Sequence, residues 1–182
     1  MGRGHQHTRV VAVKSALVVL VLVLSAACSA QAAPAATQAD GEIEKGGISP
    51  FDNDHPAIRN LDPALRDAVR QAAKEAKATR GIDAKITSGW RSRQYQQRLL
   101  DEAVEKYGSL DEARKFVNTP EKSTHVNGKA VDIGPTDAAD WFSRKAAAYG
   151  LCQIYSNEMW HIELATTPGG ECPPMLSNAA AG

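Results

Sequence analysis

The sequence predicts an α+β fold, in which a small, mainly antiparallel sheet is flanked by several helices. Three observations lead to this class. Helical patterns fill most of the chain between residues 62 and 117, whereas most strand patterns cluster after residue 130. The strands do not alternate with helices in the rhythm of a parallel sheet. Two polar motifs fall in the late strands, so the sheet is expected to carry the functional site.

The first 32 residues have the pattern of an export signal and are left out of the fold. Three basic residues precede a short apolar run at 16–24, and small residues follow it. A spanning helix needs about 20 apolar residues, so this run is too short for one. Two cleavage sites remain open. Cleavage before Cys28, at the lipobox-like Ser25-Ala26-Ala27-Cys28, would leave a lipid-anchored protein, whereas cleavage after Ala32 would leave a secreted one. Both place the protein outside the cytoplasm.

Residues 33–50 are expected to form a flexible tether, because they are rich in Ala, Gly, Thr and charge and have little to bury. Residues 51–182 then form one domain with a core of its own.

The whole chain has 21 basic and 21 acidic residues, and loss of the three basic residues of the signal changes the formal charge from zero to −3. A nucleic-acid binder would carry a basic patch. No nucleic-acid partner is therefore expected, and the protein is expected to be a monomer.

The predicted helices follow from their end signals and apolar spacing. Asp62 is an N-cap for the helix at 63–80, and Gly81 ends it. A second helix begins at residue 92 or 93 and runs to about 106, before the next glycine. A capping box opens a third, short helix at 109–117. The apolar face of the first helix consists of Leu65, Ala68, Val69, Ala72, Ala73 and Ala76.

The predicted strands are short. Residues 82–87 alternate between apolar and polar side chains, as a half-buried strand does. Residues 130–133 form a second strand, and the helix at 137–149 that follows directs Trp141 and Phe142 toward the core. Strands at 152–155 and 160–164 are expected to pair through a turn at Ser156 and Asn157.

Two short stretches hold the residue types of a catalytic zinc site. The first, at residues 123–132, contains His125 and Asp132, and the second contains Glu158 and, three residues later, His161. A catalytic zinc ion takes three protein ligands and keeps its fourth position for water, which a nearby glutamate can deprotonate. The stretches supply two imidazoles, one carboxylate at ligand spacing and a second carboxylate for the water.

Strand alternation explains why Asp132 needs a partner. Val131 and Ile133 can face the core, which turns Asp132 to the opposite side of the strand. An unpaired carboxylate beside a core is costly, and a bound cation removes that cost. Glu158 lies an odd number of residues before His161, so it must sit in a turn or bulge to reach the same metal. The alternative, with Asp132 as a turn cap and the histidines at the surface, would be preferred for either stretch alone.

The sequence assigns no certain place in the site to the other polar residues and the cysteines. Glu163 can support the metal site or be an ordinary surface carboxylate, and His55 is expected to be exposed. Cys152 and Cys172 are the only pair that both processing routes leave inside the domain. In an oxidising compartment they are expected to form a disulfide that holds the tail after Leu164 against the domain. Two free thiols are the alternative.

The motifs resemble those of the peptidase M15 family of zinc D-alanyl-D-alanine carboxypeptidases and dipeptidases, the VanY/VanX-like enzymes. That family's pattern is S-x-H-x-x-G-x-A-x-D followed by E-x-W-H, and every fixed position is present between Ser123 and His161. A third family element, S-G-Y-R-S with a later glutamine, corresponds to Ser88–Ser92 and Gln96. Trp90 replaces the tyrosine of that element and keeps an aromatic ring. The likeness extends from about residue 62 to 164.

The resemblance implies a role for each residue. His125, Asp132 and His161 would bind Zn²⁺, and Glu158 would be the general base and acid. Arg91 would stabilise the developing oxyanion or hold the substrate's carboxylate, with Gln96 and Ser123 helping to bind the substrate.

The activity implied is an exported carboxypeptidase that removes the terminal D-alanine from peptidoglycan stem peptides. An endopeptidase of the same superfamily, a D,D-dipeptidase and a non-catalytic zinc-binding wall domain are the alternatives.

Overall fold

The computed structural model describes residues 1–4 and 37–182. Most of the predicted export signal, including Cys28, and residues 33–36 lie outside the described residues. Among the described helices, none combines the length and the apolar character that crossing a membrane requires.

The centre of the domain is a four-stranded sheet with the order β1-β2-β4-β3, and every neighbouring pair is antiparallel. The strands are β1 (Lys85–Ser88), β2 (Ala130–Gly134), β3 (Leu151–Gln153) and β4 (His161–Leu164). The α-helices are α1 (Pro56–Arg59), α2 (Pro63–Arg80), α3 (Arg93–Tyr107), α4 (Leu110–Ala113) and α5 (Thr136–Lys145). Short 3₁₀ helices are η1 (Gln38–Asp40), η2 (Ala146–Tyr149) and η3 (Ala179–Ala181). The predicted α+β class with a mainly antiparallel sheet is confirmed.

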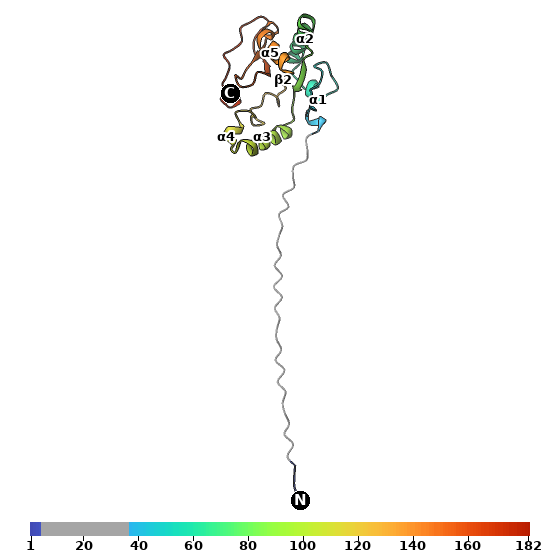
Figure 1. Cartoon of the computed structure of the whole chain (residues 1–182), viewed down its shortest axis with the longest axis vertical. Coiled ribbons are helices and arrows are strands. Elements are labelled where there is room, and N and C mark those ends of the chain that lie inside the picture. Colours follow the sequence, from blue (N-terminus) through green and yellow to red (C-terminus); the bar gives the residue numbers. More distant parts are fainter. Residues whose placement is uncertain (5–36) are drawn as a thin grey trace. The chain divides into compact units, whose positions relative to one another are not determined.

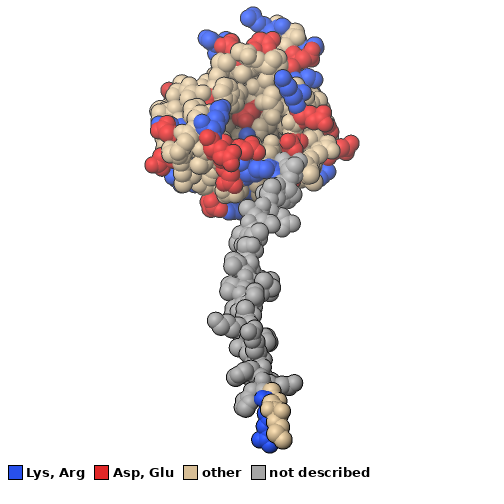
Figure 2. Space-filling model, turned by 60° about the horizontal axis from the view of Figure 1, so that its bottom comes forward, with Lys and Arg blue, Asp and Glu red and all other residues tan. Residues whose placement is uncertain are grey.

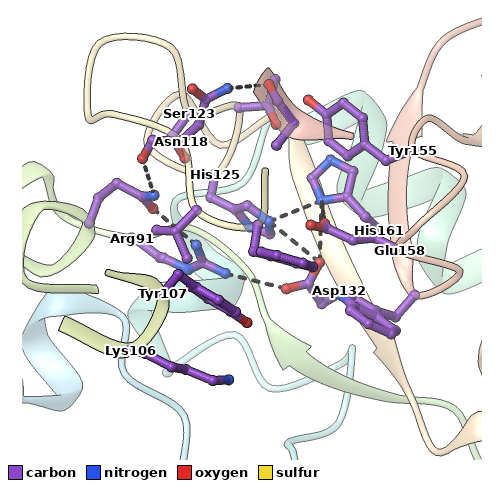
Figure 3. A pocket seen from close by; sticks show the side chains of 16 residues that line it. Arg91, Lys106, Tyr107, Asn118, Ser123, His125, Asp132, Tyr155, Glu158 and His161 are labelled. Atoms are coloured by element: carbon purple, nitrogen blue, oxygen red, sulfur yellow. Dashed lines mark hydrogen bonds and ion pairs between the residues drawn. The ribbon is translucent and has the colours of Figure 1, made fainter. Parts of the chain in front are cut away.

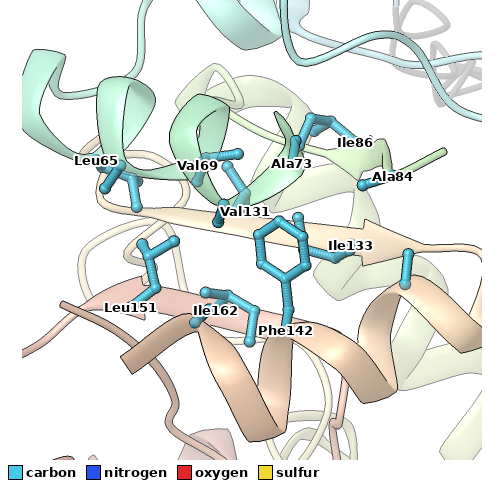
Figure 4. Packing of buried hydrophobic residues seen from close by; sticks show 14 of the residues in the cluster. Leu65, Val69, Ala73, Ala84, Ile86, Val131, Ile133, Phe142, Leu151 and Ile162 are labelled. Carbon is cyan, nitrogen blue, oxygen red and sulfur yellow. The ribbon is translucent and has the colours of Figure 1, made fainter. Parts of the chain in front are cut away.

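The hydrophobic core lies on the sheet face that α2 and α5 cover (Figure 4). Val131 and Ile133 of β2 point into it, as the alternation of the strand predicts. Phe142 of α5 is fully buried there, and Trp141 packs against the cluster from its edge. Helices α3 and α4 lie apart from α2 and α5 (Figure 1), and residues at the end of α3 line the functional pocket described below.

The predicted capping chemistry holds for α2, but the helices predicted at 137–149 and 109–117 end differently. The first is α-helical only to Lys145 and continues as the 3₁₀ helix η2. The Asp62 carboxylate accepts hydrogen bonds from the first turn of α2, and Gly81 ends this helix in a left-handed conformation. Helix α4 ends at Ala113, although the capping box predicted a helix to 117. Only half of that box forms. Ser109 accepts from the Glu112 amide, but the Glu112 side chain pairs with Lys115 at 2.6 Å and does not return to the N-cap.

The prediction of a flexible tether is wrong for residues 37–50. Ile43 and Ile48 pack against the core, and Ile48 exchanges two backbone hydrogen bonds with Ile86 of β1. Near the start of this segment, Ser92 donates a hydrogen bond of 2.8 Å from Oγ to Asp40. Composition did not reveal this docking, because two isoleucines among many small and charged residues are a weak signal.

His55 is also placed differently from the prediction. It is buried, because it caps α1 and its Nδ1 accepts a hydrogen bond of 3.1 Å from the Ala57 amide. Histidine before a proline at the first helical position could have indicated this N-cap.

The tail after β4 is attached to the domain by a disulfide. Cys152 in β3 and Cys172 are bonded, and their Cα atoms lie 5.7 Å apart. The tail then continues to Leu176, which pairs with Tyr155 in a parallel bridge.

Charged residues of both signs are interspersed over the face shown in Figure 2. Surface ion pairs include Arg144 with Asp140 at 2.7 Å and Lys77 with Asp83 at 2.6 Å. Pairs as exposed as these typically contribute about 0–1 kcal/mol each.

Candidate metal centre and its pocket

The His125 side chain is carried by a tight turn before β2. Gly128 has φ +68°, and a Cβ at this position would lie 2.5 Å from the carbonyl oxygen of Asn60. The Gly128 carbonyl in turn accepts a 2.8 Å hydrogen bond from the Asp62 amide. Only glycine satisfies both the left-handed backbone and the close approach to the chain before α2. The turn therefore returns His125 over the sheet.

Asp132 and His161 come from neighbouring strands. They are direct partners in the antiparallel pairing of β2 with β4, so their side chains lie next to each other on one face of the sheet. Ile162, the next residue in β4, points into the core on the opposite face. The sheet thus separates a polar face with the metal-binding residue types from the apolar face packed against α2 and α5.

Three atoms of metal-binding type form an almost equilateral triangle (Figure 3). His125 Nε2 lies 3.3 Å from His161 Nδ1, and Asp132 Oδ1 lies 3.4 Å from the first and 3.3 Å from the second. A tetrahedral zinc ion with bonds of about 2.0–2.1 Å requires its ligand atoms to be about 3.3 Å apart. Among the described residues this is the one group of His, Cys, Asp and Glu side chains found at metal-binding separation.

Each histidine is held in the tautomer that a metal ligand needs. His125 Nδ1 donates a 2.9 Å hydrogen bond to the Gly89 carbonyl, which leaves a lone pair on Nε2. His161 Nε2 lies 2.9 Å from Glu163 Oε1, which leaves Nδ1 facing the other two ligand atoms. Hydrogen bonds of this kind orient metal-binding imidazoles and raise their basicity. Glu163 is therefore a supporting residue of the centre, the first of the two roles that the sequence left open.

Asp132 Oδ1 is buried and has no hydrogen-bond partner. Burial alone would raise the pKa of the Asp132 carboxyl, but the His125 and His161 imidazoles hold it well below its usual range. Burial lowers the pKa of His125, whereas Asp132 and Glu163 outweigh burial at His161 and raise its pKa to about 9. A buried, ionised oxygen without a hydrogen-bond partner, facing two imidazole nitrogens, is the environment that a bound cation would complete.

Glu158 lies in the turn before β4, as the spacing argument required. The His161 amide donates to the Glu158 carbonyl at 3.1 Å, and this turn brings Glu158 Oε2 to 3.9 Å from His161 Nδ1. The side chain is buried, and burial raises the pKa of Glu158 to about 7. A carboxyl group that changes protonation near neutral pH, beside a metal-binding triangle, is suited to moving protons.

Arg91 reaches the same pocket from the segment after β1. Its guanidinium donates from Nε to Ser88 Oγ at 2.8 Å and from Nη1 to Gln96 Oε1 at 3.0 Å. Its Nη2 lies 3.3 Å from Asp132 Oδ2, the carboxylate oxygen that faces away from the triangle. Gly89, two residues before Arg91, lies against α1, where a Cβ would be 2.2 Å from the Ala57 carbonyl oxygen, so glycine is required there.

These side chains line one cavity of about 380 Å³ (Figure 3). Ser123 is buried in its wall, and Tyr155 packs its ring against His161 with a centroid distance of 4.8 Å. All the site residues expected from the motifs are thus brought together, including Arg91, Gln96, Ser123, His125, Asp132, Glu158 and His161.

Several other residues that line the cavity lie outside the sequence motifs. Tyr107 stacks on Phe116 with a centroid distance of 4.7 Å, and Lys106 lies over the Tyr107 ring. Asn118 follows the short helix α4, and Ala179 belongs to η3 in the tail after β4. Both line the cavity. No motif marks them, since they arrive through chain segments that meet only in the folded protein.

Comparison with known proteins agrees with this arrangement. Residues 59–167 match the family model described as VanY, D-alanyl-D-alanine carboxypeptidase. A curated D-alanyl-D-alanine carboxypeptidase of Enterococcus faecalis (strain ATCC 700802 / V583) is 26% identical, over 73% of this chain. The chain spans 57% of the length of that relative.

Two solved structures share the fold. A variant of the vancomycin resistance D,D-pentapeptidase VanY from a VanB-type cassette, in complex with Zn(II), has a TM-score of 0.53 at 23% identity; the match covers 57% of this chain and 71% of that one. VanYB in complex with D-alanine-D-alanine has a TM-score of 0.53 at 25% identity, with 57% and 70% covered. The family model covers more than half of the chain and includes every residue of the metal triangle. The chain therefore belongs to the VanY family of D-alanyl-D-alanine carboxypeptidases.

Proposed function

We propose that this protein is an exported, zinc-dependent D-alanyl-D-alanine carboxypeptidase that acts on the stem peptides of peptidoglycan. The observation that carries the proposal is the triangle of His125, Asp132 and His161, with sides of 3.3–3.4 Å, in one cavity with Glu158 and Arg91. The curated relative and the VanYB complex support the substrate, because their descriptions name D-alanyl-D-alanine.

Zinc would be held by His125 Nε2, His161 Nδ1 and Asp132 Oδ1. When bound, it supplies a Lewis acid for the carbonyl oxygen and acidifies the attacking water. The orphaned Asp132 Oδ1 and the two fixed tautomers fit such an ion.

Glu158 would move the protons of the reaction. Its carboxylate takes a proton from the attacking water, whose oxygen forms the new bond to the carbonyl carbon. The protonated Glu158 then gives that proton to the leaving nitrogen as the C–N bond breaks. A pKa of about 7, raised by burial, makes both forms accessible near neutral pH.

Arg91 would balance negative charge on the substrate. The developing oxyanion and the terminal carboxylate of the peptide are both partners for a planar guanidinium. Three hydrogen-bonding contacts already fix Arg91, to Ser88, Gln96 and Asp132, so it needs little rearrangement when substrate binds. Gln96 would hold the guanidinium, and Ser123 would contact the substrate from the cavity wall.

Export would follow from the signal at residues 1–32, with either lipidation at Cys28 or release after Ala32. The proposed substrate, peptidoglycan, lies outside the cytoplasm. Disulfides such as Cys152–Cys172 are typical of proteins in that oxidising environment.

The proposal is tested with protein recovered after export and intact muropeptides, with the products identified by mass. Loss of one alanine from pentapeptide stems supports a carboxypeptidase, whereas cleavage of cross-links favours the endopeptidase. Release of free D-alanine only from the dipeptide favours a D,D-dipeptidase. Absence of any cleavage by the zinc-loaded protein contradicts the proposal and leaves a zinc-binding wall domain.

A further inference from the structure

We propose that Asn118 is a positioning residue that connects the C-terminal segment Leu176–Ala181 to Arg91. The inference rests on the proposed function, because it assumes that Arg91 acts on the substrate. The tail would help to order the Arg91 guanidinium through Asn118 and Gln96. No sequence motif marks this part of the chain.

The first link is between Asn118 and the tail. Asn118 donates from its side-chain Nδ2 to the Ala179 carbonyl at 2.9 Å, and its Oδ1 accepts from the Thr119 amide at 3.2 Å. Both contacts fix the same orientation of the amide, since a carbonyl only accepts and a backbone N–H only donates. Asn118 and Ala179 are both buried, so loss of the donor would leave a buried carbonyl without a partner.

The second link is between Asn118 and Gln96. The Gln96 side chain donates from Nε2 to the backbone carbonyl of Asn118 at 2.8 Å. Its Oε1 faces the opposite way and accepts from Arg91 Nη1 at 3.0 Å. Gln96 is only 1% exposed, so no solvent competes for either contact. The position of the Asn118 peptide group therefore sets the position of Gln96, and Gln96 sets one edge of the guanidinium.

The tail is itself fixed at several points. The Leu176 amide donates to the Ile154 carbonyl at 2.9 Å, and the Ser156 amide donates to the Leu176 carbonyl at 2.8 Å. Asn178 accepts from the Ala180 amide at 3.0 Å and so holds the turn in which Ala179 lies. The disulfide at Cys172 anchors the chain just before this segment. The Ala179 carbonyl is thus a fixed acceptor, and Asn118 is the side chain that uses it.

These contacts matter because a guanidinium on a long side chain has many rotamers. Misplacement of a catalytic group by about 1 Å can reduce a rate by about 100-fold. Ser88 holds Nε of Arg91 and Asp132 holds Nη2. Nη1 is held by Gln96, which is itself placed by the Asn118–Ala179 contact. Loss of the support from Gln96 should leave Arg91 in the site but less well ordered, so we expect kcat/KM to fall about tenfold.

A double-mutant cycle tests the path of the effect. Asn118→Ala is compared in the wild-type and in the Arg91→Ala background, with zinc content and folding measured for every variant. We expect kcat/KM to fall about tenfold in the first background and to change less than twofold in the second. Asn118→Asp is the second variant, because it keeps the acceptor for Thr119 and replaces only the donor to Ala179. It should also lose activity.

A spectroscopic readout does not depend on turnover. The side-chain Nε–H resonance of Arg91, assigned by its absence in Arg91→Lys, should shift or broaden in Asn118→Ala. Asn53→Ala is the matched control: it removes another asparagine with a side-chain hydrogen bond, to Arg70, outside the residues that line the cavity. This control should leave both the resonance and the rate unchanged.

An equal loss of activity in both backgrounds, or an unchanged Arg91 resonance in Asn118→Ala, would overturn the inference. If the wild type cleaves no substrate, the proposed function fails, and the resonance alone still decides whether Asn118 orders Arg91.

Discussion

His125 Nε2 and His161 Nδ1 lie 3.3 Å apart, and in the neutral rings that Gly89 and Glu163 orient, neither of these nitrogens would carry a hydrogen. His125 donates its proton to Gly89, and His161 directs its other nitrogen to Glu163. Two lone pairs facing one point are unfavourable until a proton or a cation lies between them. This relationship is the physical basis of the metal predictions.

We predict that the protein binds one zinc ion and that His125→Ala loses it. Metal analysis of both proteins after dialysis measures the zinc content. The matched control is His55→Asn, which replaces a buried histidine outside the triangle and keeps an N-cap acceptor for α1. It should retain zinc. Equal zinc content in wild type and His125→Ala would contradict this prediction.

Glu158→Gln should keep zinc and lose most of the turnover, because the amide cannot take the proton from water. General acid–base contributions are typically about 100- to 10,000-fold. Rates on a peptide ending in D-alanyl-D-alanine, together with metal content, measure the effect. If the variant stays near wild-type activity, another group moves the proton.

Amidation of the substrate's terminal carboxylate should reduce cleavage at least about tenfold, and Arg91→Ala should remove this difference. A hydrogen bond to a charged group contributes roughly 1.5–3 kcal/mol. The measurement is kcat/KM for the free and the amidated peptide with both proteins. If amidated peptides are cut as well as free ones, the endopeptidase alternative is favoured, and Arg91→Ala should then slow all substrates alike through the oxyanion.

The stability of the metal-free protein should fall as the pH rises from about 6.5 to 9. The pKa of His161 is raised to about 9 in the folded protein, and its value is about 6.5 in an unfolded chain. Protonated His161 therefore stabilises the folded state by on the order of 3 kcal/mol at a pH below its pKa in the unfolded chain. This contribution is lost as the pH rises past its pKa in the folded protein. Thermal unfolding with a chelator present measures it. Glu163→Gln should reduce the pH dependence; a flat profile in the wild type would show that His161 is not protonated.

The disulfide should stabilise the domain by roughly 3 kcal/mol in the loop-entropy model, since 20 positions separate the two cysteines. Mass measurement after alkylation should find Cys152 joined to Cys172. The double variant Cys152→Ser/Cys172→Ser should unfold at lower denaturant concentration with native zinc content. Two alkylated thiols in the exported protein would contradict the bridge.

The sequence by itself determined most of the local elements and the residue types of the centre. Asp62 and Gly81 mark the ends of α2, and the alternation of Val131, Asp132 and Ile133 assigns the metal side of β2. These features depend on residues close together in the chain, whose capping and two-residue periodicity can be read locally.

Only the tertiary structure decided which distant segments complete the cavity. The Gly89 carbonyl, which fixes the His125 tautomer, is a backbone group and leaves no mark in the sequence. The Asn118–Ala179 contact joins residues 61 positions apart, and neither belongs to a motif. Docking of residues 37–50 likewise depends on Ile48 meeting an unpaired edge of β1. Such contacts join segments that are far apart in the sequence. They form only when the whole chain has folded, so the local pattern of either segment does not predict them.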